Sequence, residues 1–178
     1  DWQSSEQDQA LRQQLCKMVS RACRQNLMIS SYGTLSHRVG TEGEDHFVMT
    51  PNGVSRLKLV EADLVTVRDG EIVSGGCPSR ATKLHRAIYR KYPEIQSVLM
   101  TQAPSVTAHA VAHQTVDVHT NPESWVFARD ISTVPFGVQL GRDPQVPDSL
   151  TPDNPVAIVA NDCVIAMGAS LTQTFDRI

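Results

Sequence analysis

Three short segments combine glycine, proline and hydroxyl side chains in a way that could hold an anion. Glycine lets backbone N–H groups approach a ligand closely, and hydroxyl side chains add further donors. The third segment opens a predicted helix, whose N-terminus carries a partial positive charge, and its arginine could contact a phosphate or carboxylate in bidentate fashion. Each segment alone is also what an ordinary turn requires, so both interpretations stay open. The segments are Gly33-Thr34, Thr50-Pro51-Asn52-Gly53 and Pro78-Ser79-Arg80.

Histidines offer a second kind of chemistry. His109 and His113 are four residues apart on a predicted helix and therefore share one face, and His119 follows shortly after them. This spacing could bind a metal ion, although the sequence does not fix a third ligand. We favour the alternative, in which these side chains are half-buried or face solvent. His85 lies near Ile88 on another predicted helix and is expected to pack and form hydrogen bonds in the core.

Several other charged residues have no assigned role. Glu123, Arg129 and Asp130 lie next to aromatic residues and could line a ligand pocket. A surface helix with its own ion pair is the alternative, and we favour it slightly. Lys58 and Lys83 could form a Schiff base only if they were buried and deprotonated, which nothing in the sequence indicates.

Hydrophobic periodicity and turn signals predict the elements that must position these residues. Hairpins at Asp69-Gly70 and Asn161-Asp162, together with intervening helices, favour an α/β fold. The expected arrangement is a three-layer α/β/α sandwich around a central, mostly antiparallel sheet. We expect helices over residues 11–26, 78–93, 104–113 and 122–129 and from 171 onward. We expect strands after 30–36 and at 46–50, 64–67, 71–73, 97–100, 156–160 and 163–167, and an exposed loop over 141–155.

Length and composition limit the classes of protein to which the chain can belong. Its 178 residues suit one domain, residues 1–178, with a net charge of -3 and no block of Lys or Arg. Nucleic acid and membrane partners are therefore not expected. The four scattered cysteines indicate reduced thiols of a cytoplasmic protein. The last predicted helix is short, so we expect the native chain to continue past Ile178.

Read in order, the motifs are similar to those of a known family. Besides the three turn segments they include residues 84–89, the strand at 97–100 and the closing hairpin Asn161-Asp162-Cys163. From Leu11 to Ile178 the chain resembles the class II aldolase/adducin family, whose enzymes include fuculose-phosphate and rhamnulose-phosphate aldolases and ribulose-phosphate 4-epimerase. The resemblance implies a homo-oligomer, usually a cyclic tetramer with the active site between neighbouring subunits.

The same resemblance assigns roles to the three turn segments. It implies a phosphate pocket, although Thr34 stands where many members have Asn. The substrate-binding residues implied in this way are Gly33, Thr34, Thr50, Gly53, Ser79 and Arg80.

The resemblance fails at the metal site. Family enzymes hold zinc with a His-x-His pair on one strand and a third histidine in the last hairpin; these positions are Met100, Gln102 and Asp162 here. A thioether, an amide and one carboxylate are not the nitrogen-rich set that zinc prefers. The carboxylate that family aldolases carry after Pro-Ser is replaced by Ala81, whose methyl group cannot move a proton. We therefore expect no metal, no cofactor and no ordinary class II aldolase activity.

Two functional hypotheses follow from this reading. In the first, the chain is a divergent enzyme acting on a sugar phosphate or a small keto or hydroxy acid without zinc. Met100, Gln102 and Asp162 would then line the old metal cavity, and Asp162 would be the candidate for proton transfer. In the second, the chain is a catalytically inert, adducin-like domain that binds a ligand or a protein partner.

Overall fold

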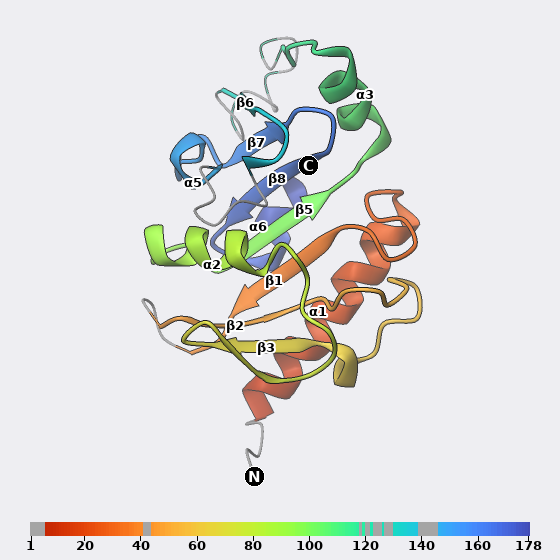
Figure 1. The fold of residues 1–178 in the computed structure, drawn as a ribbon, viewed down its shortest axis with the longest axis vertical. Helices are drawn as coiled ribbons and strands as arrows, with labels where there is room; N and C mark the ends of the chain where they lie inside the picture. The colour runs from red at the N-terminus through yellow and green to blue at the C-terminus, as the bar shows by residue number, and fades with distance from the viewer. Residues whose placement is uncertain are drawn as a thin grey trace.

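An eight-stranded β-sheet crosses the middle of the protein, with helices on both of its sides (Figure 1). The structure is a computed structural model and describes residues 6–40, 44–117, 119, 122, 126, 130–138 and 146–178. Its strands are β1 (Thr34–Arg38), β2 (His46–Met49), β3 (Val65–Arg68), β4 (Glu71–Ser74), β5 (Ser97–Thr101), β6 (Ser132–Val134), β7 (Val156–Val159) and β8 (Cys163–Gly168). Its helices are α1 (Glu6–Arg24), the 3-10 helix η1 (Glu61–Asp63), α2 (Thr82–Lys91), α3 (Pro104–Ala112), α5 (Val146–Ser149) and α6 (Leu171–Asp176).

The strand order across the sheet is β4-β3-β2-β1-β5-β8-β7-β6. All neighbouring strands run antiparallel except β6 and β7, which are parallel. The hairpin expected at Asp69-Gly70 joins β3 to β4, and both residues have positive φ angles, as a two-residue turn of this kind requires. The hairpin at Asn161-Asp162 joins β7 to β8, with φ of 59° at Asn161. Both predicted hairpins are confirmed.

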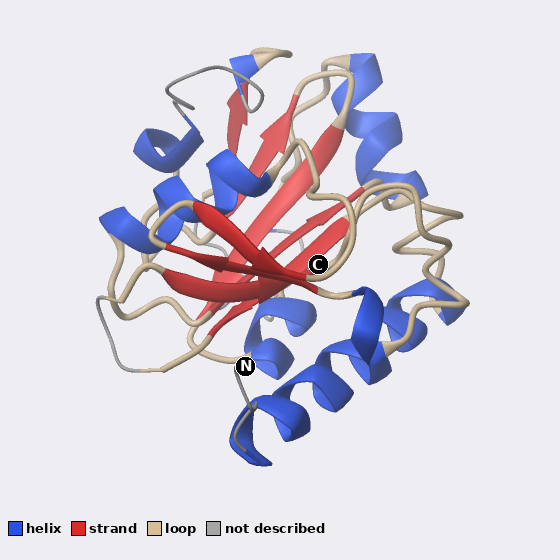
Figure 2. Cartoon of the chain, turned by 60° about the horizontal axis from the view of Figure 1, so that its bottom comes forward, coloured by secondary structure: helices blue, strands red, loops and turns tan. Residues whose placement is uncertain are grey.

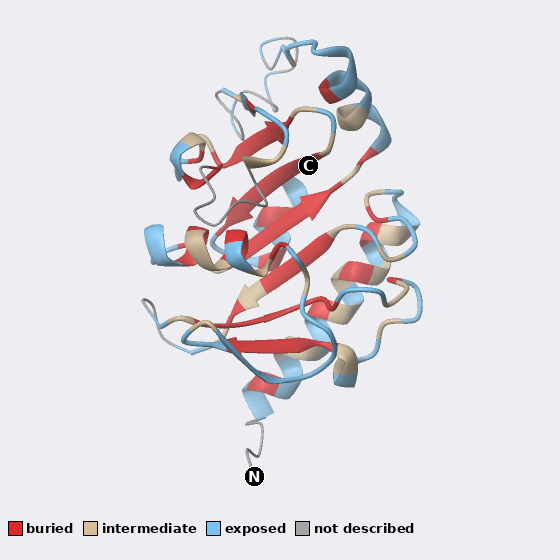
Figure 3. Cartoon of the chain, viewed as in Figure 1, coloured by how far each residue is buried: buried red, intermediate tan, exposed pale blue. Residues whose placement is uncertain are grey.

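Alternate residues of the strands supply the hydrophobic cores on the two faces of the sheet. Val98 and Met100 of β5 pack in the core that includes residues of α2 and α5, whereas Leu99 packs on the opposite face with residues of α1 and α6. Helix α3 covers part of that second face through Ala110. Figure 2 shows helices on both sides of the strands, and Figure 3 shows that the central strands are buried. The expected α/β fold is therefore confirmed.

Helix α5 corrects the prediction of an exposed loop over residues 141–155. Val146 and Leu150 are fully buried in the core on the α2 face of the sheet. The hydroxyl of Tyr92 donates to the carbonyl of Pro147 at 3.0 Å, which ties this segment to the end of α2. Prolines and aspartates dominate the sequence pattern here, so the pattern does not reveal that Val146 and Leu150 are buried.

The segment between α3 and β7 was the least predictable part of the chain. Strand β6 was not expected, because it is only three residues long and lies at the sheet edge beside β7. The helix predicted at 122–129 falls largely outside the described residues. Helix α3 itself agrees with expectation: Pro104 stands in its first turn, and His113 caps its C-terminus with φ of 53°.

Ser170 caps helix α6, as predicted. Its hydroxyl accepts the backbone N–H of Gln173 at 3.1 Å, while the Gln173 side chain accepts the N–H of Ala169 at 2.7 Å. Ser170→Ala is expected to lower the free energy of unfolding by about 1 kcal/mol, because an N–H of the first turn loses its acceptor. Urea denaturation measures this change. Thr172→Ala, on an exposed position of the same helix, is the control, and an equal loss in both variants would contradict a capping role.

Among the described helices, none is both long enough and apolar enough to cross a membrane.

Candidate functional site

A small cavity of about 70 Å³ lies where β1 begins, β5 ends and β8 begins. The antiparallel register places Thr34 of β1 opposite Met100 of β5, and Thr101 opposite Val164 of β8. These pairings bring together segments that are far apart in the sequence. The cavity is lined by Gly33, Thr34, Met100, Thr101, Gln102, Asp162 and Cys163. All three positions at which the resemblance implies zinc ligands therefore lie at one place, next to the Gly33-Thr34 turn.

Gln102 and Asp162 form a hydrogen bond across this cavity. The side-chain amide of Gln102 donates to Oδ1 of Asp162 at 3.2 Å. This bond orients both side chains and uses one carboxylate oxygen. The neighbouring Met100 offers a thioether, which is a weak acceptor.

These residues do not fit a zinc ion. Zinc in proteins takes thiolate, imidazole and carboxylate ligands, usually three or four of them from the protein. The side chains that line the cavity offer one carboxylate, one thiol, one neutral amide, one thioether and two hydroxyls, and no imidazole. Throughout the described part of the chain, no three His, Cys, Asp or Glu side chains gather closely enough to hold a metal.

Cys163 also lines the cavity, but it is not suited to be a nucleophile. The side chain is 4% exposed, and burial raises the pKa of its thiol well above the ordinary value. The charge of Asp162 and a hydrogen bond with that carboxylate raise the pKa further. The thiol therefore stays protonated near neutral pH and acts as a weak donor.

A chain of buried hydrogen bonds runs from the cavity into the core. Oγ1 of Thr34 lies 2.9 Å from Nε2 of His85, and Nδ1 of His85 lies 2.6 Å from Oγ of Ser36. The same Ser36 oxygen lies 2.6 Å from the hydroxyl of Tyr89. His85 is completely buried, and burial lowers its pKa to about 3, so the ring is neutral with one donor and one acceptor nitrogen. The expectation of a core histidine is confirmed.

The Gly33 turn is held by an arginine that sequence reasoning missed. Nε and Nη2 of Arg56 donate to the carbonyl of Gly33 at 3.1 and 2.9 Å, and Nη1 donates to the carbonyl of Val54 at 3.0 Å. Gly33 has φ of 85°, and a Cβ atom there would lie 2.8 Å from Cγ of Met28. The turn therefore needs glycine for both its conformation and its space. No sequence signal distinguishes Arg56 from a surface arginine.

The remaining predicted binding residues lie on neighbouring loops, outside the lining of this cavity. Thr50 is fully buried, and its hydroxyl accepts the backbone N–H of Leu35 at 3.2 Å. Gly53 is exposed with φ of 74°, and a Cβ atom there would contact nothing. The hydroxyl of Ser79 accepts the N–H of Ala81 at 3.2 Å just before α2, and Arg80 is exposed.

These loops are nevertheless joined to one another. The N–H of Asn52 donates to the carbonyl of Cys77 at 2.8 Å, and the hydroxyl of Thr82 contacts Sδ of Met49 at 3.2 Å. Arg56 joins the second loop to the first through Gly33. The structure thus connects the three segments that the sequence singled out.

The other histidines and charged residues do not form a site in the described part of the chain. His109, His113 and His119 are exposed; Nδ1 of His109 donates to the carbonyl of Ser105, and His119 pairs with Asp117. Lys58 and Lys83 are also exposed, so burial does not prepare either of them for Schiff-base chemistry. Of the charged residues in the 122–129 region, Glu123 and Arg129 lie outside the described residues, and Asp130 is exposed.

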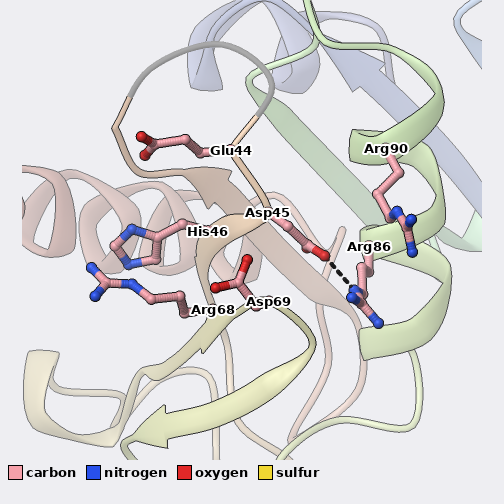
Figure 4. A pocket seen from close by; sticks show the side chains of 7 residues that line it. All are labelled: Glu44, Asp45, His46, Arg68, Asp69, Arg86 and Arg90. Carbon is pink, nitrogen blue, oxygen red and sulfur yellow. Dashed lines mark hydrogen bonds and ion pairs between the residues drawn. The ribbon is translucent and has the colours of Figure 1, made fainter.

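A second, wider cavity of about 810 Å³ lies where β2 begins and β3 ends, beside α2 (Figure 4). Arg86 of α2 forms an ion pair with Asp45 at 2.6 Å across its floor. Three arginines face three carboxylates, so the lining has no dominant charge. Of the residues singled out in the sequence, only the turn residue Asp69 lies here, and none of the candidate site residues does. The lining residues are Glu44, Asp45, His46, Arg68, Asp69, Arg86 and Arg90.

Solved structures with the same fold are found among sugar-phosphate enzymes and their relatives. YgbL from Escherichia coli superposes with a TM-score of 0.87 at 24% identity, covering 97% of this chain and 84% of YgbL. An L-fuculose 1-phosphate aldolase from Glaciozyma antarctica superposes with a TM-score of 0.79 at 18% identity, covering 98% of this chain and 72% of that one. At these identities the likeness establishes the fold.

Sequence comparison adds the family. An L-fuculose phosphate aldolase from Methanocaldococcus jannaschii is 24% identical over 168 residues, covering 94% of this chain and 89% of the relative. A methylthioribulose-1-phosphate dehydratase from Xanthomonas campestris is 40% identical over 74 residues, or 40% of this chain and 33% of the relative. The family model for the class II aldolase and adducin N-terminal domain matches residues 13–178. Because that match spans nearly all of the sequence, the chain belongs to the class II aldolase and adducin family.

Proposed function

We propose that this chain, acting as a single domain, binds a sugar phosphate or a small keto or hydroxy acid without the zinc chemistry of its relatives. The observation that carries the proposal is the gathering of Thr34, Gln102 and Asp162 in one cavity beside the three joined loops. Relatives at low identity include aldolases and dehydratases of sugar phosphates. The proposed binding residues are Gly33, Thr34, Gly53, Ser79 and Arg80, together with Thr50, which is fully buried and acts by accepting the N–H of Leu35.

The cavity is suited to the hydroxylated end of such a ligand. Its volume of about 70 Å³ holds only a few non-hydrogen atoms, so the remainder of a ligand must lie over the loops. Gln102 and Asp162 offer acceptors, and Gln102 retains a second amide hydrogen that can donate to a ligand hydroxyl. The charged lining residue is a carboxylate, which disfavours an anionic group at this end.

Asp162 is the residue that we propose for proton transfer. Its carboxylate is partly exposed to the cavity, and the bond from Gln102 fixes its orientation. A carboxylate held in this way can accept a proton from a ligand hydroxyl or from a carbon next to a carbonyl. Ala81 supplies no second acid or base, so the reaction class that fits is an isomerisation rather than an aldol cleavage. Asp162 would take a proton from a carbon next to a carbonyl and return it to the product.

A neighbouring subunit is proposed to complete the site. Ile29, Tyr32 and Leu57 are 53, 61 and 72% exposed on the segments next to Gly33 and Arg56. Exposed apolar side chains gathered beside a site favour contact with another protein surface. The proposed compartment is the cytoplasm, since all four cysteines are free thiols.

The alternative function is that of an inert binder, and Ala81 is the observation that favours it. Its methyl group is buried where the resemblance implies an acid or base, just before α2. A chain that has lost this carboxylate can still bind a ligand without transforming it.

Thermal unfolding against a panel of sugar phosphates and hydroxy acids, followed by turnover assays, tests both functions. We expect at least one panel member to raise the melting temperature. If turnover occurs, Asp162→Asn should lower it about a hundredfold because the proton acceptor is lost. Asp153→Asn, an exposed carboxylate in a loop, is the matched control. Stabilisation without turnover would favour the inert binder, and no stabilisation by any member would contradict both.

A further inference from the structure

Arg56 carries a buried positive charge that no carboxylate balances among the described residues. The side chain is 3% exposed, and its hydrogen bonds go to the backbone carbonyls of Gly33 and Val54. Its own backbone N–H donates to the carbonyl of Ser30 at 2.7 Å. None of the ion pairs in the described part of the chain includes Arg56.

Burying a charge without a counter-charge costs free energy, because the charge loses its hydration. This cost favours the neutral form of Arg56 and so lowers its pKa. Burial lowers the pKa of Arg56 to about 10, so the guanidinium is still charged at neutral pH. Carbonyl dipoles satisfy its donors without neutralising it. An anion bound nearby would supply the missing negative charge.

Arg56 is placed where such an anion would act. It follows Gly53 by three residues, and its two bonds to Gly33 fix the turn that precedes Thr34. A second buried arginine, Arg38, also donates to backbone carbonyls, but it lies at the other end of β1. The molecule thus contains two similar arginines, and one of them lies beside the candidate site.

We infer that Arg56 is a positioning residue for anion binding: its buried charge and its hold on the Gly33 carbonyl prepare the adjacent loops for a phosphate group. This inference rests on the proposed function and adds to it the orientation of the ligand in the site. The phosphate lies over the loops joined by Arg56, and the uncharged hydroxylated end reaches Gln102 and Asp162. In the opposite orientation the phosphate would lie beside the Asp162 carboxylate, which repels it.

Inorganic phosphate is the probe that tests this role, with binding measured by calorimetry at a temperature where all variants are folded. Arg56→Met removes the charge, and a fall in phosphate affinity of about tenfold is expected from the loss of one nearby buried charge. Arg56→Lys keeps the charge but cannot make all three hydrogen bonds to Gly33 and Val54, so it should lose less affinity than Arg56→Met does. Arg38→Met is the matched control: it removes an equally buried arginine away from the site and should leave phosphate affinity unchanged.

The outcomes separate this inference from the function on which it rests. If the unaltered protein binds phosphate and Arg56→Met binds it equally well, Arg56 is structural and the inference is wrong. If Arg38→Met and Arg56→Met lose affinity alike, the effect is one of general stability and the inference is also wrong. If the unaltered protein binds a keto or hydroxy acid but neither phosphate nor a sugar phosphate, the inference is wrong and the proposed function stands. If it binds none of these, the proposed function itself is wrong. If Arg56→Met does not fold, Arg56→Gln takes its place, with the same tenfold loss expected.

Discussion

Replacement of His85 by leucine is expected to lower the free energy of unfolding by about 3 kcal/mol. The imidazole is completely buried and bonds to the hydroxyls of Thr34 and Ser36 through its two nitrogens. Leucine fills a similar volume, but it cannot form the hydrogen bonds that His85 makes with the hydroxyls of Thr34 and Ser36. Urea denaturation at neutral pH measures the loss. His109→Leu, on an exposed surface of α3, is the control and should change stability by less than about 0.5 kcal/mol.

The pH dependence of stability provides a second readout of the same residue. Burial lowers the pKa of His85 from 6.5 to about 3, so the folded protein keeps the ring neutral while the unfolded chain protonates it below pH 6.5. Unfolding therefore takes up a proton between pH 6.5 and 3, and stability falls as the pH drops through this window, by about 1.4 kcal/mol per pH unit. Burial also lowers the pKa values of His37 and His46, which act in the same direction.

His85→Gln removes the titrating ring and tests that assignment. Glutamine still offers one donor and one acceptor to the surrounding hydroxyls, so this variant should fold. Its stability should depend less steeply on pH between 6.5 and 3 than that of the unaltered protein, by about one proton in the slope. An unchanged slope would contradict the neutral, buried state of His85.

The largest expected increase in zinc affinity comes from introducing three histidines at the positions that line the cavity. Met100→His, Gln102→His and Asp162→His together should raise zinc affinity at least about a thousandfold over the unaltered chain, because three converging nitrogens make the donor set that zinc prefers. Met100 and Gln102 are two residues apart and line the same cavity, and Asp162 already contacts Gln102. Imidazole rings at these three positions are therefore expected to converge on one ion.

Competition with a chromophoric chelator measures this affinity, and cobalt absorption reports a tetrahedral site. The variant that carries only the substitutions at Met100 and Gln102 is the matched control and should bind zinc with intermediate affinity. If the triple variant bound zinc no better than the unaltered chain, the three positions would not converge, and the assignment of the cavity as the old metal site would be wrong.

Local signals in the sequence were sufficient for most of the fold. Turn residues with positive φ, such as Asp69 and Asn161, fixed two hairpins, and Ser170 marked the start of the last helix. Elements without a local signal were missed. Strand β6 is short and paired with a distant segment, and α5 depends on two buried side chains, Val146 and Leu150, whose burial is a tertiary property.

The candidate site could be predicted only in part, because the resemblance indicates positions in the sequence but not the contacts between them. The resemblance directed attention to Met100, Gln102 and Asp162, which line one cavity in the structure. It could not indicate Arg56 or the hydrogen bonds of Thr34 with His85, because both depend on contacts between residues more than 20 positions apart. Whether Thr50, Gly53, Ser79 and Arg80 bind a ligand stays a prediction.

The metal content of the purified protein, determined by mass spectrometry together with thermal unfolding before and after a chelator, tests most directly whether the zinc site is lost. We predict substoichiometric zinc and a melting temperature that the chelator does not change. One equivalent of zinc per chain, with a clear fall in melting temperature when it is removed, would contradict this account of the cavity.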